Sequence, residues 1–319
     1  MLKTIFINTL KLLIAAGLIY WLLSSGKLDF KLLLQLKNYP LQIVISLVLM
    51  VVNLWLVSYR WRLILKARSE AAIPLMGVFK VNWIGLFFSS VLPGSVSGDL
   101  VKMLYVEKFD NNFTKKFVFA SILIDRVMGL CGLILLVGIS TILFSGHILN
   151  KSPAMAPILN FNYLLCSFVL VGFCIFVFFH IHVRKIFEHF QPIFFRNFWA
   201  RLILLWNDLV MIKSHMIKAV LISLIVQLNS VVIFWIVIYP FVTGQMDFVQ
   251  ALAFIPIGNM ALALPIAPSG LGVGHAIFQK LFELSGIMNG ASLFNLYFVV
   301  NAVVNIVGVI PYLTTKHEK

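Results

Sequence analysis

The stretch Leu92–Lys102, with the sequence LPGSVSGDLVK, places chain-breaking and charged residues within a strongly apolar region. Gly94 ends one apolar arm, and Gly98 precedes a predicted helix that begins at Asp99. There the Asp99 carboxylate is expected to cap free amides, and these amides together with the helix dipole form an anion site. Lys102 follows three residues later, so it shares a helix face with Asp99 and can pair with it.

A second charged motif, SILIDRVMG, places Asp125 and Arg126 near the start of a later apolar run. Adjacent side chains on a helix point about 100° apart, so these two do not simply neutralise each other. The Arg126 guanidinium can bind a phosphate with two hydrogen bonds, or it can reach Asp99. The alternative for Arg126 is a side chain that extends to the membrane interface, and for Asp99 a purely structural pair and cap. Ionisable groups within apolar segments are nevertheless candidate functional groups, because an unpaired charge is costly in hydrocarbon.

The second chain-breaking stretch, LPIAPSGLGVGH, contains Pro268, Gly270, Gly272, Gly274 and His275. Its glycines allow close backbone approach and positive φ angles. His275 can donate a hydrogen bond to a phosphate, although a lone histidine is often a satisfied core residue. No strand precedes these glycines, so a dinucleotide loop is not predicted. No cofactor and no metal are expected, since no His, Cys, Asp or Glu cluster has ligand spacing.

The elements that must position these residues are membrane-spanning helices. The chain has 319 residues, of which 61% are hydrophobic and 11% charged, and a soluble domain of this size cannot bury so much apolar surface. The apolar runs are continuous rather than alternating, which predicts an all-α integral membrane protein. The net charge of +14 is spread between the runs, which indicates membrane topology and contact with anionic headgroups, not nucleic-acid binding.

Six runs are predicted to cross the membrane completely, at about residues 5–24, 41–59, 117–145, 158–180, 219–241 and 291–312. Two interrupted stretches, about 74–110 and 249–287, are either re-entrant or broken-helix hairpins or pairs of full spans, and the last case gives eight or more spans. The distribution of Lys and Arg places both termini in the cytoplasm in either case. Asparagines within the runs are expected to form interhelical hydrogen bonds; these are Asn53, Asn82, Asn229, Asn259, Asn301 and Asn305.

The hairpin alternative divides a single transmembrane domain, 1–319, into two halves at about 1–146 and 147–319. Each half then reads span, span, hairpin, span, and the two hairpins enter from opposite sides, which is an inverted-topology repeat. Between the fourth and fifth spans, residues 184–216 alternate large apolar side chains with charged ones. This segment is predicted to be an amphipathic helix in the cytoplasmic interface.

Three motifs resemble those of one family, the lysylphosphatidylglycerol synthase transmembrane region, also described as a flippase-like domain. LPGSVSGDLVKMLY resembles P-G-x-x-G-D-x-x-R, SILIDRVMGLCGLILL resembles S-x-x-x-E-R-x-x-G-L, and LPIAPSGLGVGHAIF resembles P-x-x-P-G-G-L-G-x-x-E. The departures are Lys102 for Arg, Asp125 for Glu, Ser269 for Gly and His275 for Glu. Because His275 stands where the family has a glutamate, this chain lacks one anion that could bind a cationic headgroup. The resemblance therefore does not extend to a lysyl headgroup for this chain.

The resemblance implies a membrane domain that moves a phosphate-bearing lipid between leaflets, derived from phosphatidylglycerol or linked to a polyprenyl phosphate. In the family's synthases a separate C-terminal domain makes the lipid. Here the sequence ends at Lys319, directly after the last predicted span, which indicates a stand-alone membrane domain of the cell inner membrane. Two alternatives remain open: a membrane enzyme with Asp99 or His275 as general base, and a non-catalytic partner of a separately encoded lipid-modifying enzyme.

Overall fold

The computed structural model describes residues 31–69, 72–91, 97–189, 213–263 and 272–314, with the single positions 203, 206, 207 and 210. Every regular element in these residues is a helix, so the all-α prediction is confirmed. The α-helices are α2 (Lys31–Leu36), α3 (Pro40–Leu65), α4 (Leu75–Val91), α5 (Ser97–Val106), α6 (Lys115–Lys151), α7 (Ala156–His189), α9 (Lys213–Val242), α10 (Phe248–Leu262), α11 (Val273–Glu283), α12 (Gly290–Val307) and α13 (Val309–Thr314).

Five helical stretches among the described residues are long and apolar enough to cross a membrane. They are Pro40–Leu65, Lys115–Lys151, Pro153–Phe176, His215–Val242 and Gly290–Thr314. The shortest has 24 residues, which at about 1.5 Å per residue exceeds a hydrocarbon thickness of about 30 Å. These stretches correspond to five of the six predicted spans. The remaining prediction, residues 5–24, lies outside the described residues.

The first interrupted stretch is an antiparallel hairpin of α4 and α5. Gly77, at the start of α4, packs against Phe109 just beyond α5, while Gly85 lies against Gly98 at the start of α5. The hairpin therefore begins and ends at the same end of the helix bundle. With 10 residues, α5 is about 15 Å long, which is half of a full crossing.

The second interrupted stretch forms a matching hairpin of α10 and α11. Gly258 of α10 packs on the Phe278 ring of α11. At the hairpin's base, the Gln250 amide donates to the hydroxyls of Ser152 (3.1 Å) and Ser285 (3.2 Å). Ser152 follows α6, whereas the base of the first hairpin lies next to the start of α6, so the two hairpins enter the bundle from opposite ends.

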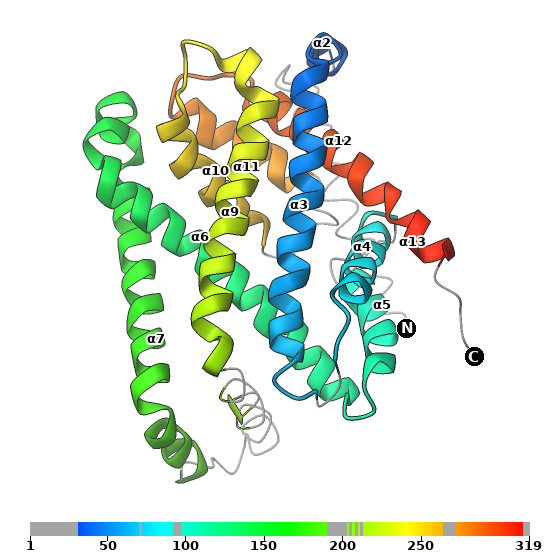
Figure 1. Ribbon diagram of the computed structural model, residues 1–319. Helices are drawn as coiled ribbons and strands as arrows, with labels where there is room; N and C mark the ends of the chain where they lie inside the picture. The colour runs from blue at the N-terminus through cyan, green and yellow to red at the C-terminus, as the bar shows by residue number, and fades with distance from the viewer. Residues whose placement is uncertain are drawn as a thin grey trace, which may run out of the picture.

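The helices surround a central pair, α3 and α9, which lie side by side (Figure 1). The first hairpin packs through α4 on α12, and the second packs through α10 on α6. An inverted repeat would relate α3 to α9 and α6 to α12. Each hairpin would then pack on the last span of the other half, as α4 does on α12 and α10 does on α6. The repeat itself, with halves 1–146 and 147–319, stays a prediction.

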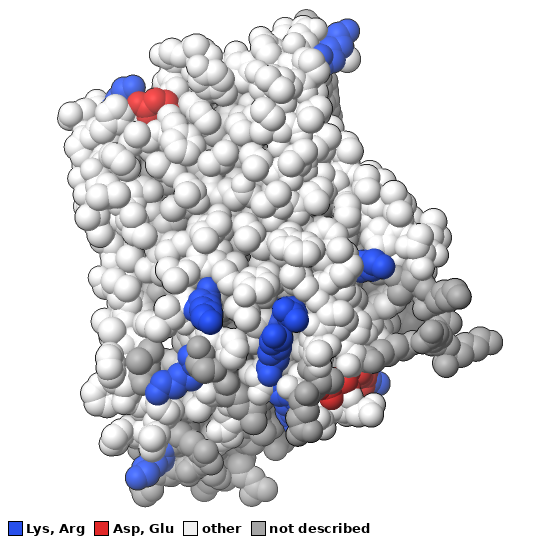
Figure 2. Space-filling model, in the orientation of Figure 1, with Lys and Arg blue, Asp and Glu red and all other residues white. Residues whose placement is uncertain are grey.

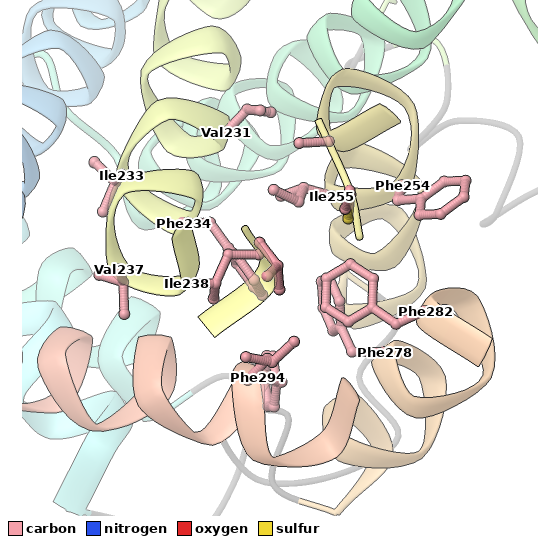
Figure 3. Packing of buried hydrophobic residues seen from close by; sticks show 14 of the residues in the cluster. Val231, Ile233, Phe234, Val237, Ile238, Phe254, Ile255, Phe278, Phe282 and Phe294 are labelled. Atoms are coloured by element: carbon pink, nitrogen blue, oxygen red, sulfur yellow. The ribbon is translucent and has the colours of Figure 1, made fainter. Parts of the chain in front are cut away.

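Stacked aromatic rings fix the second hairpin to its neighbours (Figure 3). Phe278 of α11 stacks on Phe234 of α9, with ring centroids 4.9 Å apart, and on Phe294 of α12, at 5.0 Å. All three side chains are almost completely buried. Offset stacking adds about 0.5–1.5 kcal/mol per pair to the burial of the rings, so these contacts hold α11 firmly against α12.

The two ends of the bundle differ in charge. Basic residues gather around the end of α3 and the start of α6, among them Lys66, Arg68, Lys115 and Lys116, and we call this the basic end. Figure 2 shows that Lys and Arg on this face lie mostly over the lower half of the molecule, with few charges near the upper end. Most of the predicted amphipathic segment 184–216 lies outside the described residues.

At the opposite end, Asp247 ties the α9–α10 connection to the end of α6. Its carboxylate accepts hydrogen bonds from His147 Nε2 (2.5 Å) and Lys151 Nζ (2.8 Å). It also caps α10 by accepting a hydrogen bond from the backbone N–H of Gln250 (2.9 Å). Partial burial raises the pKa of the Asp247 carboxyl, but the bonds from Lys151, Gln250 and His147 outweigh it and lower that pKa from 3.8 to about 2.

The Asp247 contacts predict an acid-sensitive contribution to stability. Because its pKa is lower in the folded chain, ionised Asp247 stabilises the fold above its unfolded pKa, and this contribution is lost as the pH falls from about 4 through about 2. Solvent screening limits its size to about 1 kcal/mol. Thermal unfolding in detergent from about pH 5 to pH 2 is expected to show a steeper loss for wild type than for Asp247→Asn. Parallel curves would contradict the assignment.

Candidate functional site

Charged residues from the first hairpin and α6 meet inside the bundle. The Asp99 carboxylate lies between two cations: Lys102 Nζ at 3.5 Å, one turn along α5, and the guanidinium of Arg126 on α6. Asp99 and Lys102 are largely buried, while half of the Arg126 side chain is exposed. Helix α5 begins at Ser97, so Asp99 lies in its first turn instead of capping a helix that starts there. The pairing follows from the three-residue spacing, and the expected cap position is corrected.

Asp125, which precedes Arg126 in the sequence, pairs with a different arginine. Asp125 accepts two hydrogen bonds from the Arg60 guanidinium of α3, from Nε at 2.7 Å and Nη2 at 3.0 Å. Arg60 Nη1 also donates to Ser223 of α9 at 2.9 Å, and only 4% of the arginine side chain is exposed. The second predicted span, about residues 41–59, ends just before Arg60. The structure continues α3 to Leu65, which brings Arg60 inside the bundle.

The depth of these charges depends on the long, oblique α6 (Figure 1). Arg126 lies eleven residues after Lys115, the first residue of α6, which is about 16 Å along the helix axis. Arg60, Asp125, Asp99 and Lys102 are largely buried, so these charges interact more strongly than at a surface. Arg60 and Asp125 balance each other, whereas Asp99 faces two cations, Lys102 and Arg126. Among the described residues, the Asp99 cluster therefore carries a net positive charge suited to an anion.

A chamber of about 180 Å³, with both polar and apolar walls, adjoins this charged cluster. Lys102 forms part of its wall, and its ammonium lies 5.7 Å from the centre of the Trp61 ring. The remaining described lining comes from α3, α4, α9 and α12 and combines amide and apolar side chains: Met50, Asn53, Leu54, Val57, Asn82, Leu86, Ile233, Tyr297, Asn301, Val304 and Asn305.

A larger and more apolar groove continues from the chamber. It encloses about 400 Å³ and shares Tyr297, Asn301 and Asn305 with the chamber. Its other described lining residues are Ser89, Ser90, Leu262, Phe294, Phe298, Ala302 and Ile306. Ser89 and Ser90 end α4, and Leu262 ends α10, so the groove lies where the two hairpins approach each other along α12. A polar chamber joined to an apolar groove can hold an amphipathic molecule.

The residues of the second break are only partly within the described structure. Gly272 adopts φ +77° directly before α11, and Gly274 packs against the Phe294 ring, where a side chain would clash. His275 is buried, with its ring edge-to-face on Phe294 and Nε2 3.3 Å from the Asn295 oxygen. Among the described residues, no hydrogen bond or ion pair joins His275 to the Asp99 cluster. Gly94, Pro268 and Gly270 lie outside the described residues.

These observations define the class of protein: a polytopic helical membrane protein with two hairpins that enter from opposite ends and an internal charged site. A family model, described as the lysylphosphatidylglycerol synthase TM region, matches residues 8–310. The chain therefore belongs to the lysylphosphatidylglycerol synthase transmembrane-region family, which associates it with the handling of membrane lipids. No curated protein and no solved structure is detectably similar to it.

Proposed function

We propose that the protein moves a phosphate-bearing lipid between the leaflets of the cell's inner membrane, with both of its termini in the cytoplasm. One observation carries the proposal: the chamber beside Lys102 continues into an apolar groove between the two hairpins. A lipid has the same division into a polar headgroup and apolar chains. Acyl chains in the groove and the surrounding bilayer, with the headgroup in the chamber, would leave neither part in an unfavourable environment.

The charged cluster supplies a reversible anion site. Lys102 and Arg126 both pair with Asp99 in the structure. A lipid phosphate could take the place of the Asp99 carboxylate against these cations, and the backbone amides in the first turn of α5 point in a direction that favours an anion. In that state Asp99 would take up a proton, because an unpaired carboxylate among buried groups would be costly, and it would restore the resting pairs when the lipid leaves.

A leaflet-exposure assay in reconstituted vesicles tests this function. Wild type is expected to move fluorescent phosphatidylglycerol or a polyprenyl phosphate across the bilayer, and both Asp99→Asn and Arg126→Ala are expected to reduce the rate at least roughly tenfold. The matched control is Lys280→Ala, which removes an exposed charge on α11 away from the cavities. Folding of each variant is checked by thermal unfolding.

The same assay separates the proposal from its alternatives when the lipid is analysed chemically afterwards. Movement of an unaltered lipid that depends on Asp99 and Arg126 would support translocation. Conversion to a new lipid species would favour a membrane enzyme. No movement of any tested lipid by a folded protein would contradict the proposal and favour a partner of a separately encoded lipid-modifying enzyme.

A further inference from the structure

The chamber beside Lys102 is lined with carboxamides rather than carboxylates. Its described polar side chains are Asn53, Asn82, Asn301, Asn305, Tyr297 and Lys102. Lys102 is the only charged residue in this described lining. An asparagine offers two N–H donors and an oxygen that accepts two hydrogen bonds, so four of them provide a wall of mixed polarity.

Hydrogen bonds hold these amides in fixed positions. The Asn305 amide donates to Asn301 Oδ1 at 2.9 Å and to Ser90 Oγ at 3.1 Å, and the Asn82 amide donates to Ser58 Oγ at 3.0 Å. These bonds use only part of the capacity of each side chain. The oxygens of Asn82 and Asn305 take no part in them. The chamber therefore presents both donors and acceptors in a rigid arrangement.

We propose that this chamber selects a polyol phosphate headgroup, in which the phosphate carries an uncharged, hydroxyl-bearing group such as glycerol or a sugar, and that it rejects headgroups with a cationic amine. The inference rests on the proposed function and names its class of substrate. Lys102 holds the phosphate, and the asparagines bind the hydroxyls.

The charges of the wall account for both parts of this selectivity. A hydroxyl donates and accepts, as the amides do, whereas an ammonium group only donates and is repelled by the Lys102 ammonium. Asp99 is not in the described lining, so this lining offers no carboxylate to an ammonium group. A phosphate without a polyol would leave buried amides unpaired, which is costly in a site built for hydrogen bonds.

Lipid binding to the purified full-length chain tests the inference without requiring transport. Native mass spectrometry in detergent would compare four lipids with identical acyl chains: phosphatidylglycerol, phosphatidylinositol, phosphatidic acid and aminoacylated phosphatidylglycerol. The first two are expected to bind at least roughly tenfold more tightly than the others. Equal binding of all four, or preference for the aminoacylated lipid, would overturn the inference from wild type alone.

A pair of variants assigns the preference to the chamber. Asn301→Leu is expected to reduce polyol binding to the level of phosphatidic acid. The control is Asn162→Leu on α7, where a buried amide has no hydrogen-bond partner among the described residues, so leucine should be tolerated there. Retention of the full preference by folded Asn301→Leu would contradict the assignment.

The two proposals fail in different ways. Preferential binding of polyol lipids without transbilayer movement would contradict the proposed translocation and support the proposed headgroup selectivity. Movement of the aminoacylated lipid as fast as phosphatidylglycerol, with no difference in binding, would support translocation and contradict the headgroup selectivity.

Discussion

Replacing Arg60 by leucine is expected to lower the free energy of unfolding by about 3–5 kcal/mol, because it leaves the buried Asp125 carboxylate without its partner. Two hydrogen bonds to Asp125 and one to Ser223 are lost together. The guanidinium joins α3, α6 and α9, so its loss should also loosen the helices that carry the lipid site. Thermal unfolding in detergent, followed by helix content, measures the effect.

The double variant Arg60→Leu/Asp125→Leu provides the decisive comparison. When both charges are replaced by apolar groups, most of the lost stability should return, because a buried ion pair adds little net stability over apolar packing. A double variant as unstable as Arg60→Leu alone would show that the cost comes from lost packing of the arginine stem instead. The exposed Lys280→Ala variant should unfold like wild type, since a surface pair contributes at most about 1 kcal/mol.

The Arg60–Asp125 pair also shows which parts of the site the sequence could not predict. The two residues are 65 positions apart, and their contact depends on how α3 crosses α6. Local patterns report spacing along one helix, which is why the Asp99–Lys102 pair was predictable from its three-residue interval. A contact between helices requires their crossing geometry, and a single sequence does not contain that information in any local form.

The asparagines illustrate the same difference. Interhelical hydrogen bonding was predicted for all of them, and Asn229 indeed donates to Leu49 O and Asn53 Oδ1 of α3. Asn53, Asn82, Asn301 and Asn305 line the chamber in addition to bonding their neighbours. Only the relative positions of α3, α4 and α12 bring these amides to one cavity, so residue type alone could not separate the two groups.

The hairpins were more accessible to prediction. Pro and Gly clusters interrupt otherwise continuous apolar runs, and the arms on either side are too short for a full crossing. Whether each pair of arms crosses the membrane or only enters it was left open by the charge distribution, since both alternatives give the same sidedness. The lengths of α5, with 10 residues, and α11, with 11 residues, favour hairpins, because each is about half of a full crossing.

Replacing Gly98 by alanine is expected to disrupt the first hairpin at the point where it carries the site. A Cβ atom there would lie well inside van der Waals contact with the Gly85 carbonyl oxygen and Ser89 Oγ of α4. Backbone cannot move aside as a flexible side chain can, so the cost should reach or exceed the 1–3 kcal/mol typical of overpacking. Displacement of α5 would also separate Asp99 from Arg126, and lipid movement should fall at least roughly tenfold.

Two other glycines distinguish a local clash from a general effect of alanine. At Gly146 of α6 a new Cβ meets nothing within 4 Å, so alanine there should leave lipid movement unchanged and stabilise the helix slightly. At Gly85 the nearest obstacles are Lys102 Cε at 2.5 Å and Cγ at 2.8 Å, both in a side chain, while the nearest backbone atom, Gly98 O, lies at 3.2 Å. Gly85→Ala should therefore displace the lysine and weaken lipid binding at a smaller cost in stability than Gly98→Ala. If Gly98→Ala were as stable and as active as Gly146→Ala, close packing of α4 on α5 could not be what positions Asp99 and Lys102.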